Sequence, residues 1–392
     1  MSLSDKPFDI VVFGASGYTG RLVAKYLAAE YAGSDLKWAM AGRSLEKLAA
    51  VRAEMGISGA VELLAVDVDD PGSVTHMVDA CRVVITTVGP YQLYGDELVK
   101  KCAERRTDYV DLTGEPSWMH ETIAQYSSAA KASGARIVHS CGFDSIPFDL
   151  GVYRLQQHAI AKTGQPIAMV KGRVRAMNGT FSGGTIASMR ATMASAKANP
   201  AIIQVLTNPF ALTEGFTGPE QPAGMAPQYD EELKSWSAPF IMAPINTKNI
   251  HRSNFLLGHQ YGEDFRYDEM LLTGDGDKGK AAADYVVKDD SVARSDLQPG
   301  EGPTKEEREN GNYDAIFVGE TSEGELLISS VQGDQDPGYG STSKMLAEAA
   351  MCLLVNPDLA SGGLWTPAAA MGDALMARLQ EHAGLTFQIE KG

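Results

Sequence analysis

Short apolar runs alternate with helical segments over residues 1–150. Nearly continuous apolar strands separated by helices are typical of a parallel sheet that is covered on both faces. We therefore predict an α/β fold whose first domain, residues 1–150, is a Rossmann-type doubly wound parallel sheet. The expected strands are 8–13, 36–42, 61–67, 83–89, 108–114 and 135–141. The expected helices are 21–32, 45–55, a short helix from Pro71, 95–106 and 118–133.

After residue 150 the strands and helices no longer follow each other in turn. This change predicts a second, α+β domain over residues 151–340, with a mixed or antiparallel sheet that serves the substrate and dimerisation. Its expected elements are strands 167–177, 254–261 and 264–273, helices 147–158, 184–198 and 278–287, and a hairpin of 313–320 with 325–331. A poorly ordered surface loop is expected at 299–310. Helices 341–355 and 367–383, within residues 341–392, are expected to pack back on the first domain.

Composition limits the partners without changing this fold. The 392 residues carry 34 Lys and Arg against 50 Asp and Glu, a formal net charge of −16. Nucleic acid and anionic membranes bind basic faces, so neither is expected as a partner. The four cysteines lie far apart, which indicates free thiols in a reducing compartment and no metal site. No 18-residue apolar run occurs, so we expect no transmembrane segment and a cytoplasmic protein.

A glycine-rich turn joins the first expected strand to the first expected helix. Its sequence, Gly14-Ala-Ser-Gly-Tyr-Thr-Gly20, has the spacing Gly-x-x-Gly-x-x-Gly. Such a turn leaves free N–H groups at the positive end of a helix dipole, where a dinucleotide pyrophosphate binds. Glycine turns also occur there without a ligand, so the rest of the chain must support the assignment. The predicted contacts are Gly14, Ser16, Gly17, Tyr18, Thr19 and Gly20.

The end of the second strand distinguishes between dinucleotides. Folds that bind NAD normally carry an acidic residue there, whereas this chain has Arg43 and Ser44. A guanidinium and a hydroxyl suit a 2′-phosphate, which favours NADP(H) over NAD and FAD. A solvated arginine at a helix start is the alternative. Further contacts are expected at later strand ends, from Asp67 to the adenine and from Val88, Gly89 and Pro90 beside the nicotinamide.

The proton donor is sought next to the expected nicotinamide. Short-chain dehydrogenases use a Tyr-x-x-x-Lys pair, but Tyr126 to Lys131 and Tyr339 to Lys344 are each one residue too long. That mechanism is therefore excluded. We predict Tyr91 as the donor and Asp144 as the second choice, with turn or cap bonding as the alternative for Asp144. The other candidates are Tyr94, Asp111, Thr113, Glu115, Ser145 and His139, the last being expected as a core histidine.

Several motifs together resemble one enzyme family. Gly14–Gly20, Ala41-Gly-Arg-Ser44, Gly89-Pro-Tyr-Gln-Leu-Tyr-Gly95, Asp108-Tyr-Val-Asp-Leu-Thr-Gly-Glu115 and Cys141-Gly-Phe-Asp-Ser-Ile-Pro-Phe-Asp149 resemble the saccharopine dehydrogenase-like oxidoreductases. Gly338-Tyr-Gly-Ser-Thr-Ser-Lys-Met345 and Trp365-Thr-Pro-Ala-Ala-Ala-Met-Gly372 are similar to its trans-acting enoyl reductase branch. The resemblance implies a Rossmann domain, an NADP-type cofactor and reduction of a carbon–carbon or carbon–nitrogen double bond.

The substrate is the least specified part. Segment 208–249 is rich in proline and carries apolar side chains such as Phe210 and Met242. It is either a lid over an apolar acyl substrate or a surface loop pinned by its own hydrophobic residues. We expect an NADPH-dependent reductase of an enoyl, lipid-like substrate, ahead of an imine or amino-acid oxidoreductase. A non-catalytic NADP-binding sensor is the alternative from another class, and a homodimer is expected from fold analogy alone.

Overall fold

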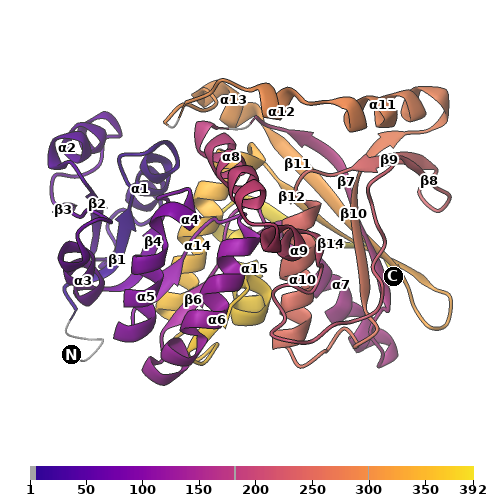
Figure 1. Cartoon of the computed structure of the whole chain (residues 1–392), viewed down its shortest axis with the longest axis horizontal. Coiled ribbons are helices and arrows are strands. Elements are labelled where there is room, and N and C mark those ends of the chain that lie inside the picture. The colour runs from indigo at the N-terminus through magenta and orange to yellow at the C-terminus, as the bar shows by residue number, and fades with distance from the viewer. Residues whose placement is uncertain (1–5, 181, 299) are drawn as a thin grey trace.

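Two seven-stranded sheets lie side by side in the computed structural model, which describes residues 6–180, 182–298 and 300–392. In Figure 1 strands β1 to β6 of the first sheet, indigo to purple, lie on the left and the second sheet lies on the right. Helices α14 (Thr342–Val355) and α15 (Pro367–His382), in yellow, lie between them. The predicted α/β fold, with a doubly wound sheet and a second mixed sheet, is confirmed.

All strands of the first sheet run parallel. Their order is β13 (Gly363–Trp365), β6 (Arg136–Val138), β5 (Asp108–Val110), β4 (Cys81–Thr86), β1 (Phe8–Phe13), β2 (Trp38–Gly42) and β3 (Glu62–Ala65). β1 pairs with β2 on one side and with β4 on the other, so the strand order reverses there. A reversal opens a crevice at the carboxyl ends of the central strands, where doubly wound folds bind their ligands.

β1 explains why these strands read as continuous apolar runs. Ile10 and Val12 point into one hydrophobic core, and Val11 and Phe13 point into the other. Both faces of the sheet are therefore covered by helices. These helices are α1 (Tyr18–Glu30), α2 (Leu45–Glu54), α3 (Pro71–Ala80), α4 (Tyr91–Tyr94), α5 (Asp96–Arg105) and α6 (Pro116–Ser133), together with α14. Strand β13 was not predicted from the sequence, because three residues are too few to show a period.

The second sheet is mixed. Its order is β14 (Leu385–Lys391), β12 (Leu326–Gly333), β11 (Asn312–Glu320), β7 (Met169–Asn178), β10 (Arg266–Gly274), β9 (Ser235–Pro239) and β8 (Gln228–Asp230). β7 and β10 pair in parallel, and the other neighbours pair antiparallel. β11 and β12 form the predicted hairpin. Helix α7 (Ile146–Thr163) packs on this sheet so closely that a Cβ on Gly151 would lie 2.0 Å from the ring of Phe317.

The strand predicted at 254–261 is wrong. Its first residues end helix α10 (Ala243–Leu256), and the rest form the turn that follows. Pro244 lies in the first turn of α10, where a missing N–H removes no helical hydrogen bond. Segment 208–249 is also less irregular than predicted, since it contains β8, β9 and the start of α10.

The loop predicted at 299–310 contains helix α13 (Lys305–Asn310), which a capping box of Thr304 and Glu307 begins. Pro299 lies outside the described residues. The other elements are α8 (Gly183–Ala198), α9 (Ala201–Thr207), α11 (Gly276–Lys288), α12 (Ser291–Arg294) and the π-helical turn η2 (Pro337–Ser341). None of the helices in the described ranges is long and apolar enough to cross a membrane.

Candidate functional site

The glycine turn between β1 and α1 leaves no room for side chains at two of its positions. A Cβ on Gly14, whose φ is +88°, would lie 2.7 Å from Thr87 Oγ1. A Cβ on Gly20 would lie 2.1 Å from the carbonyl oxygen of Gly14. Gly17 is the N-cap of α1, and the first N–H groups of a helix have no partner within it. The turn is therefore a cradle of backbone donors that fits a pyrophosphate.

The side chain of Tyr18 joins the glycine turn to helix α13. Its hydroxyl donates a hydrogen bond to the carbonyl oxygen of Pro303 and accepts one from Arg308 Nη1 at 2.6 Å. Its ring meets the ring of Tyr339 edge to face, with centroids 5.1 Å apart. Thr19, the next residue, lines the cavity described below. Tyr18 can therefore offer its backbone to an anion while its side chain holds α13 in place.

The ends of β2 and β3 carry the residues predicted to read the adenosine half. Arg43 is exposed, and Ser44 Oγ accepts a hydrogen bond from Lys47 N at 3.2 Å as the N-cap of α2. Asp67 Oδ1 accepts from Asp69 N at 3.1 Å. Ser16 Oγ lies 3.6 Å from where a Cβ on Gly42 would stand. The guanidinium of Arg43 is thus the group best suited to a 2′-phosphate.

The residues after β4 lie against the glycine turn. Val88 Cγ2 is 2.8 Å from where a Cβ on Gly14 would stand, so the two segments touch. Gly89 packs against the ring of Tyr91, and Pro90 is the N-cap of α4. The structure thus brings together the two segments predicted to hold the pyrophosphate and the nicotinamide ribose.

Glu115, after β5, connects this crevice to helix α8. Its two carboxylate oxygens accept hydrogen bonds from the backbone N–H groups of Tyr91 and Gln92, both at 2.9 Å. Gln92 Nε2 donates to Glu115 at 3.0 Å and to Thr192 Oγ1 at 3.1 Å, and Gln92 Oε1 accepts from Ser195 Oγ at 2.8 Å. Helix α8 is therefore held across the carboxyl ends of the strands.

A cavity of about 540 Å³ opens at these strand ends. Thr19, Gly89, Tyr91, Glu115 and Asp144 line its first-sheet side, and α8, the start of α10 and η2 close the other side. The larger apolar side chains in its wall are Leu112, Phe143, Met177, Met189, Met193, Leu206, Phe240, Ile241, Met242 and Ile245. The described part of the wall contains no lysine or arginine, and its charged residues are Glu115 and Asp144.

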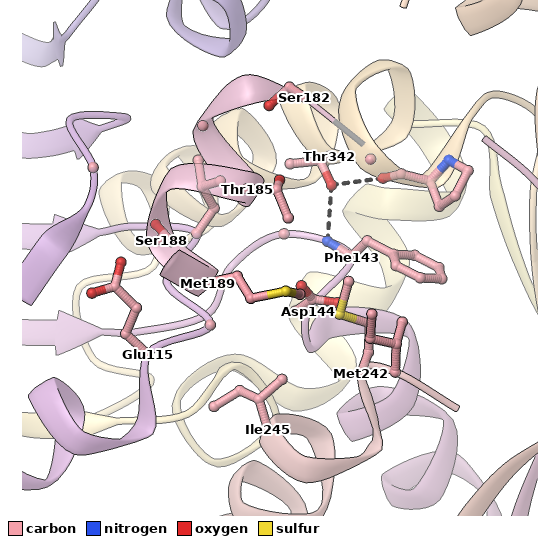
Figure 2. Close-up of a pocket in the computed structure, with 18 of the residues that line it drawn as sticks. Glu115, Phe143, Asp144, Ser182, Thr185, Ser188, Met189, Met242, Ile245 and Thr342 are labelled. Carbon is pink, nitrogen blue, oxygen red and sulfur yellow. Dashed lines mark hydrogen bonds between the residues drawn. The ribbon is translucent and has the colours of Figure 1, made fainter. Parts of the chain in front are cut away.

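Asp144 is one of the two charged residues in the described part of this wall. Figure 2 shows Met189 from α8 and Met242 from the start of α10 pointing toward its carboxyl group. Asp144 Oδ1 is buried without a hydrogen-bond partner in the structure. Burial raises the pKa of Asp144 to about 7. A carboxyl group in this environment can carry a proton at neutral pH and donate it.

Tyr91, the other predicted donor, is already engaged with the backbone. Its hydroxyl donates to the carbonyl oxygen of Thr86 at 3.1 Å, and its ring stacks on Trp118 with centroids 5.4 Å apart. Burial raises the pKa of Tyr91 well above its usual value. Its phenol therefore holds its proton firmly and fixes the segment after β4.

Of the remaining candidates, Glu115 lines the cavity, and the others lie outside its wall. His139 Nδ1 is 2.7 Å from Asp111 Oδ2, and both side chains are buried, as expected of a core histidine. Ser145 Oγ accepts a hydrogen bond from Asn249, Thr113 is buried in the turn after β5, and Tyr94 is exposed. Among the residues that the structure describes, no three His, Cys, Asp or Glu side chains are grouped as metal ligands.

Neither tyrosine–lysine pair forms a catalytic dyad. The hydroxyl of Tyr126 donates to Asp96 at 2.8 Å. Tyr339 lines the cavity, but its hydroxyl bonds Ser182 N and Thr185, while Lys344 pairs with Asp334 at 3.6 Å. This agrees with the sequence-based exclusion of the short-chain dehydrogenase mechanism.

The polar face of α8 was missed by the sequence reasoning. Ser182, the N-cap of α8, lines the cavity together with Thr185, Ser188, Met189 and Thr192, which stand at positions i, i+3, i+4 and i+7 of the helix. This is the spacing of one helix face. The small, polar residues of the expected helix 184–198 could have indicated a cavity-lining face. A face of this kind is, however, equally typical of a solvent-exposed helix.

The fold and the cradle define a nucleotide-binding oxidoreductase, and comparisons with known proteins identify its family. Residues 10–138 match the family model of the saccharopine dehydrogenase NADP binding domain. The chain is 40% identical to a Mycobacterium tuberculosis protein provisionally named a trans-acting enoyl reductase, across 99% of both chains. It is 34% identical to the trans-acting enoyl reductase of Mycobacterium bovis, across 97% of both.

Solved structures support the same fold. Apo saccharopine dehydrogenase from Saccharomyces cerevisiae matches with a TM-score of 0.55 at 12% identity, over 97% of this chain and 99% of that one. Homospermidine synthase from Legionella pneumophila, in complex with NAD, matches with a TM-score of 0.56 at 8% identity, over 97% and 91%.

The chain belongs to the saccharopine dehydrogenase-like oxidoreductases, together with these trans-acting enoyl reductases. The predicted family and NADP(H) as the cofactor are thereby confirmed. The glycine cradle and the exposed guanidinium of Arg43 fit this cofactor, because they supply backbone donors for a pyrophosphate and a cation for a 2′-phosphate.

Proposed function

We propose that this protein uses NADPH to reduce the carbon–carbon double bond of an apolar, enoyl-type acyl substrate. The observation that carries the proposal is the cavity wall, which is mainly apolar and whose described residues include no lysine or arginine. A tricarboxylic amino acid such as saccharopine needs cationic partners, which this wall does not offer. An acyl chain needs only apolar contacts, which the methionine, leucine and isoleucine side chains of the wall provide.

The arginines of β7 and α10 that could bind the carboxylates of such a substrate have other partners. Arg173 pairs with Asp268 at 3.1 Å, and Arg175 pairs with Asp314 at 2.9 Å and with Glu390. Arg252 donates to the carbonyl oxygens of Leu212 and Leu364. These contacts stabilise the sheet and α10, and they favour the acyl substrate over the amino-acid one.

In this proposal Asp144, Tyr91 and helix α8 each have a defined role. Bound NADPH supplies a hydride, and the reduced substrate then needs one proton. Asp144 donates that proton, because its carboxyl group faces the cavity and burial favours its neutral form. Tyr91 was predicted first, but its hydroxyl already donates to Thr86, so it positions the loop after β4. Helix α8 excludes water from the reacting atoms.

The contacts proposed for the cofactor are those expected from the sequence. Residues 1–150 would bind NADPH and residues 151–340 would form most of the acyl site, with 341–392 supporting both. A homodimer stays a prediction.

The test uses purified protein and NADPH with panels of α,β-unsaturated acyl thioesters, cyclic imines and aldehydes. Acyl-dependent oxidation of NADPH, lowered at least about 100-fold in Asp144→Asn, is the expected result. Tyr91→Phe is the matched comparison and should retain most of the activity. Oxidation with imines alone would favour the amino-acid alternative. Stoichiometric NADPH binding without oxidation by any panel would favour the sensor.

A further inference from the structure

A group of buried polar side chains lies behind the part of the cavity wall that Asp144 forms. Asn249 Nδ2 donates to the hydroxyl of Ser145, the residue after Asp144, at 2.8 Å. Asn246 Nδ2 donates to Glu269 Oε1 at 2.7 Å. Asn246 and Asn249 are three residues apart on α10 and therefore share one face of that helix. This face connects the turn that carries Asp144 to Glu269 on β10.

Three hydrogen-bond acceptors of this group lack a donor. Asp144 Oδ1, Asn246 Oδ1 and Asn249 Oδ1 are all buried without a partner in the structure. Buried acceptors normally have donors, and the missing donor can be the O–H of a neutral carboxyl group. Two carboxyl groups, those of Asp144 and Glu269, are available here. The composition of the cluster therefore matches a site that stores protons.

We propose that Glu269 is a positioning residue that returns a proton to Asp144 after each donation. The inference rests on the proposed function, in which Asp144 is the donor. The O–H bond of Asp144 breaks as a C–H bond forms on the substrate. The O–H bond of Glu269 then breaks as that of Asp144 forms again, and Glu269 recovers its proton from water. One proton is consumed for each hydride transferred.

The charges around Glu269 support this role. Burial raises the pKa of Glu269 to about 8, and the charges of Asp144 and Asp268 raise it as well, although hydrogen bonds from Tyr267 and Asn246 act in the opposite direction. Two cations on the neighbouring elements have other partners. Arg173, on the adjacent β7, pairs with Asp268, and Lys248 of α10 donates to the carbonyl oxygens of Leu206 and Pro244.

Infrared difference titration of the whole protein, without substrate, tests the coupling directly. The carbonyl band of a protonated carboxyl group disappears as that group ionises. We expect Glu269→Gln and Asp144→Asn each to remove one titrating band. In Asp144→Asn the Glu269 band should titrate at a pH lower by about one unit or more, since the neighbouring charge is gone. Asp149→Asn, at another buried carboxyl group that donates nothing to this cluster, should leave both midpoints unchanged.

Independent titration of the two groups, with no change of the Glu269 midpoint in Asp144→Asn, would overturn the inference. Glu269→Gln keeps the shape and the acceptor for Asn246, but if it does not fold, Asp144→Asn alone still reports the coupling. A wild-type protein that reduces no acyl substrate would contradict the proposed function and leave this titration intact. The two failures are therefore distinguishable.

Discussion

The α-carbon of Gly20 packs directly on the backbone of Gly14, so that a Cβ on residue 20 would lie 2.1 Å from the Gly14 carbonyl oxygen. This contact sets how closely helix α1 approaches the end of β1. Because the first turn of α1 supplies the donors of the anion cradle, the same contact positions those donors.

Gly20→Ala should therefore weaken cofactor binding and lower stability together. The added methyl group must push α1 away from β1, which typically costs about 1–3 kcal/mol of unfolding free energy. Urea unfolding and NADPH fluorescence titration measure the two effects. Gly59→Ala is the control, because a Cβ there meets nothing within 4 Å. Normal NADPH affinity in Gly20→Ala would show that the cradle does not hold the cofactor.

Arg43→Ala should separate the two nicotinamide dinucleotides. If the Arg43 guanidinium bonds the 2′-phosphate, its loss removes a charge-assisted interaction of about 1.5–3 kcal/mol, or roughly 10- to 150-fold in NADPH affinity. NADH affinity should change little. Lys47→Ala, which removes a neighbouring exposed cation of α2, should affect neither dinucleotide selectively. Equal losses for NADPH and NADH in Arg43→Ala would contradict the assignment.

The cofactor half of the site could be predicted from sequence because its chemistry is local. Gly14 and Gly20 belong to one turn, and Arg43 follows the next strand, so spacing along the chain carries the information. Asp144 and Glu269 are 125 residues apart, and α10 brings them together through Asn246 and Asn249. No local period reports such a pairing. The same holds for α8, whose polar face has meaning only where it meets the strand ends.

The buried carboxyl group of Asp149 should make the free energy of unfolding depend on pH. This buried carboxyl group on α7 accepts hydrogen bonds from Ser253 and from Ala368 N, and burial raises its pKa to about 7. A folded-state pKa above the unfolded value means that the folded chain retains the proton up to a higher pH than the unfolded chain does. The stability from Asp149 is thus complete below the unfolded pKa near 4 and is lost as the pH rises through 7.

Asp149→Asn should accordingly weaken the fall in unfolding free energy between pH 5 and pH 8. Each unit of pKa difference corresponds to about 1.4 kcal/mol. Urea unfolding at several pH values measures the slope for the wild type and the variant. Glu320→Gln, at an exposed position, is the control and should keep the wild-type slope. An unchanged slope in Asp149→Asn would mean that this carboxyl group does not retain its proton in the folded protein.

The position of Met189 in the cavity wall should affect which lengths of acyl chain the cavity accepts. Its side chain points toward Asp144 from α8, so a larger side chain there should fill space that the acyl chain would occupy (Figure 2). Burial of one methylene contributes about 0.8 kcal/mol, or roughly fourfold in affinity. Met189→Trp should therefore raise KM steeply for long acyl thioesters and little for short ones. Met225→Trp, at a side chain that is 74% exposed and outside the wall, is the matched control. Identical chain-length profiles for the two variants would place the acyl chain outside this cavity.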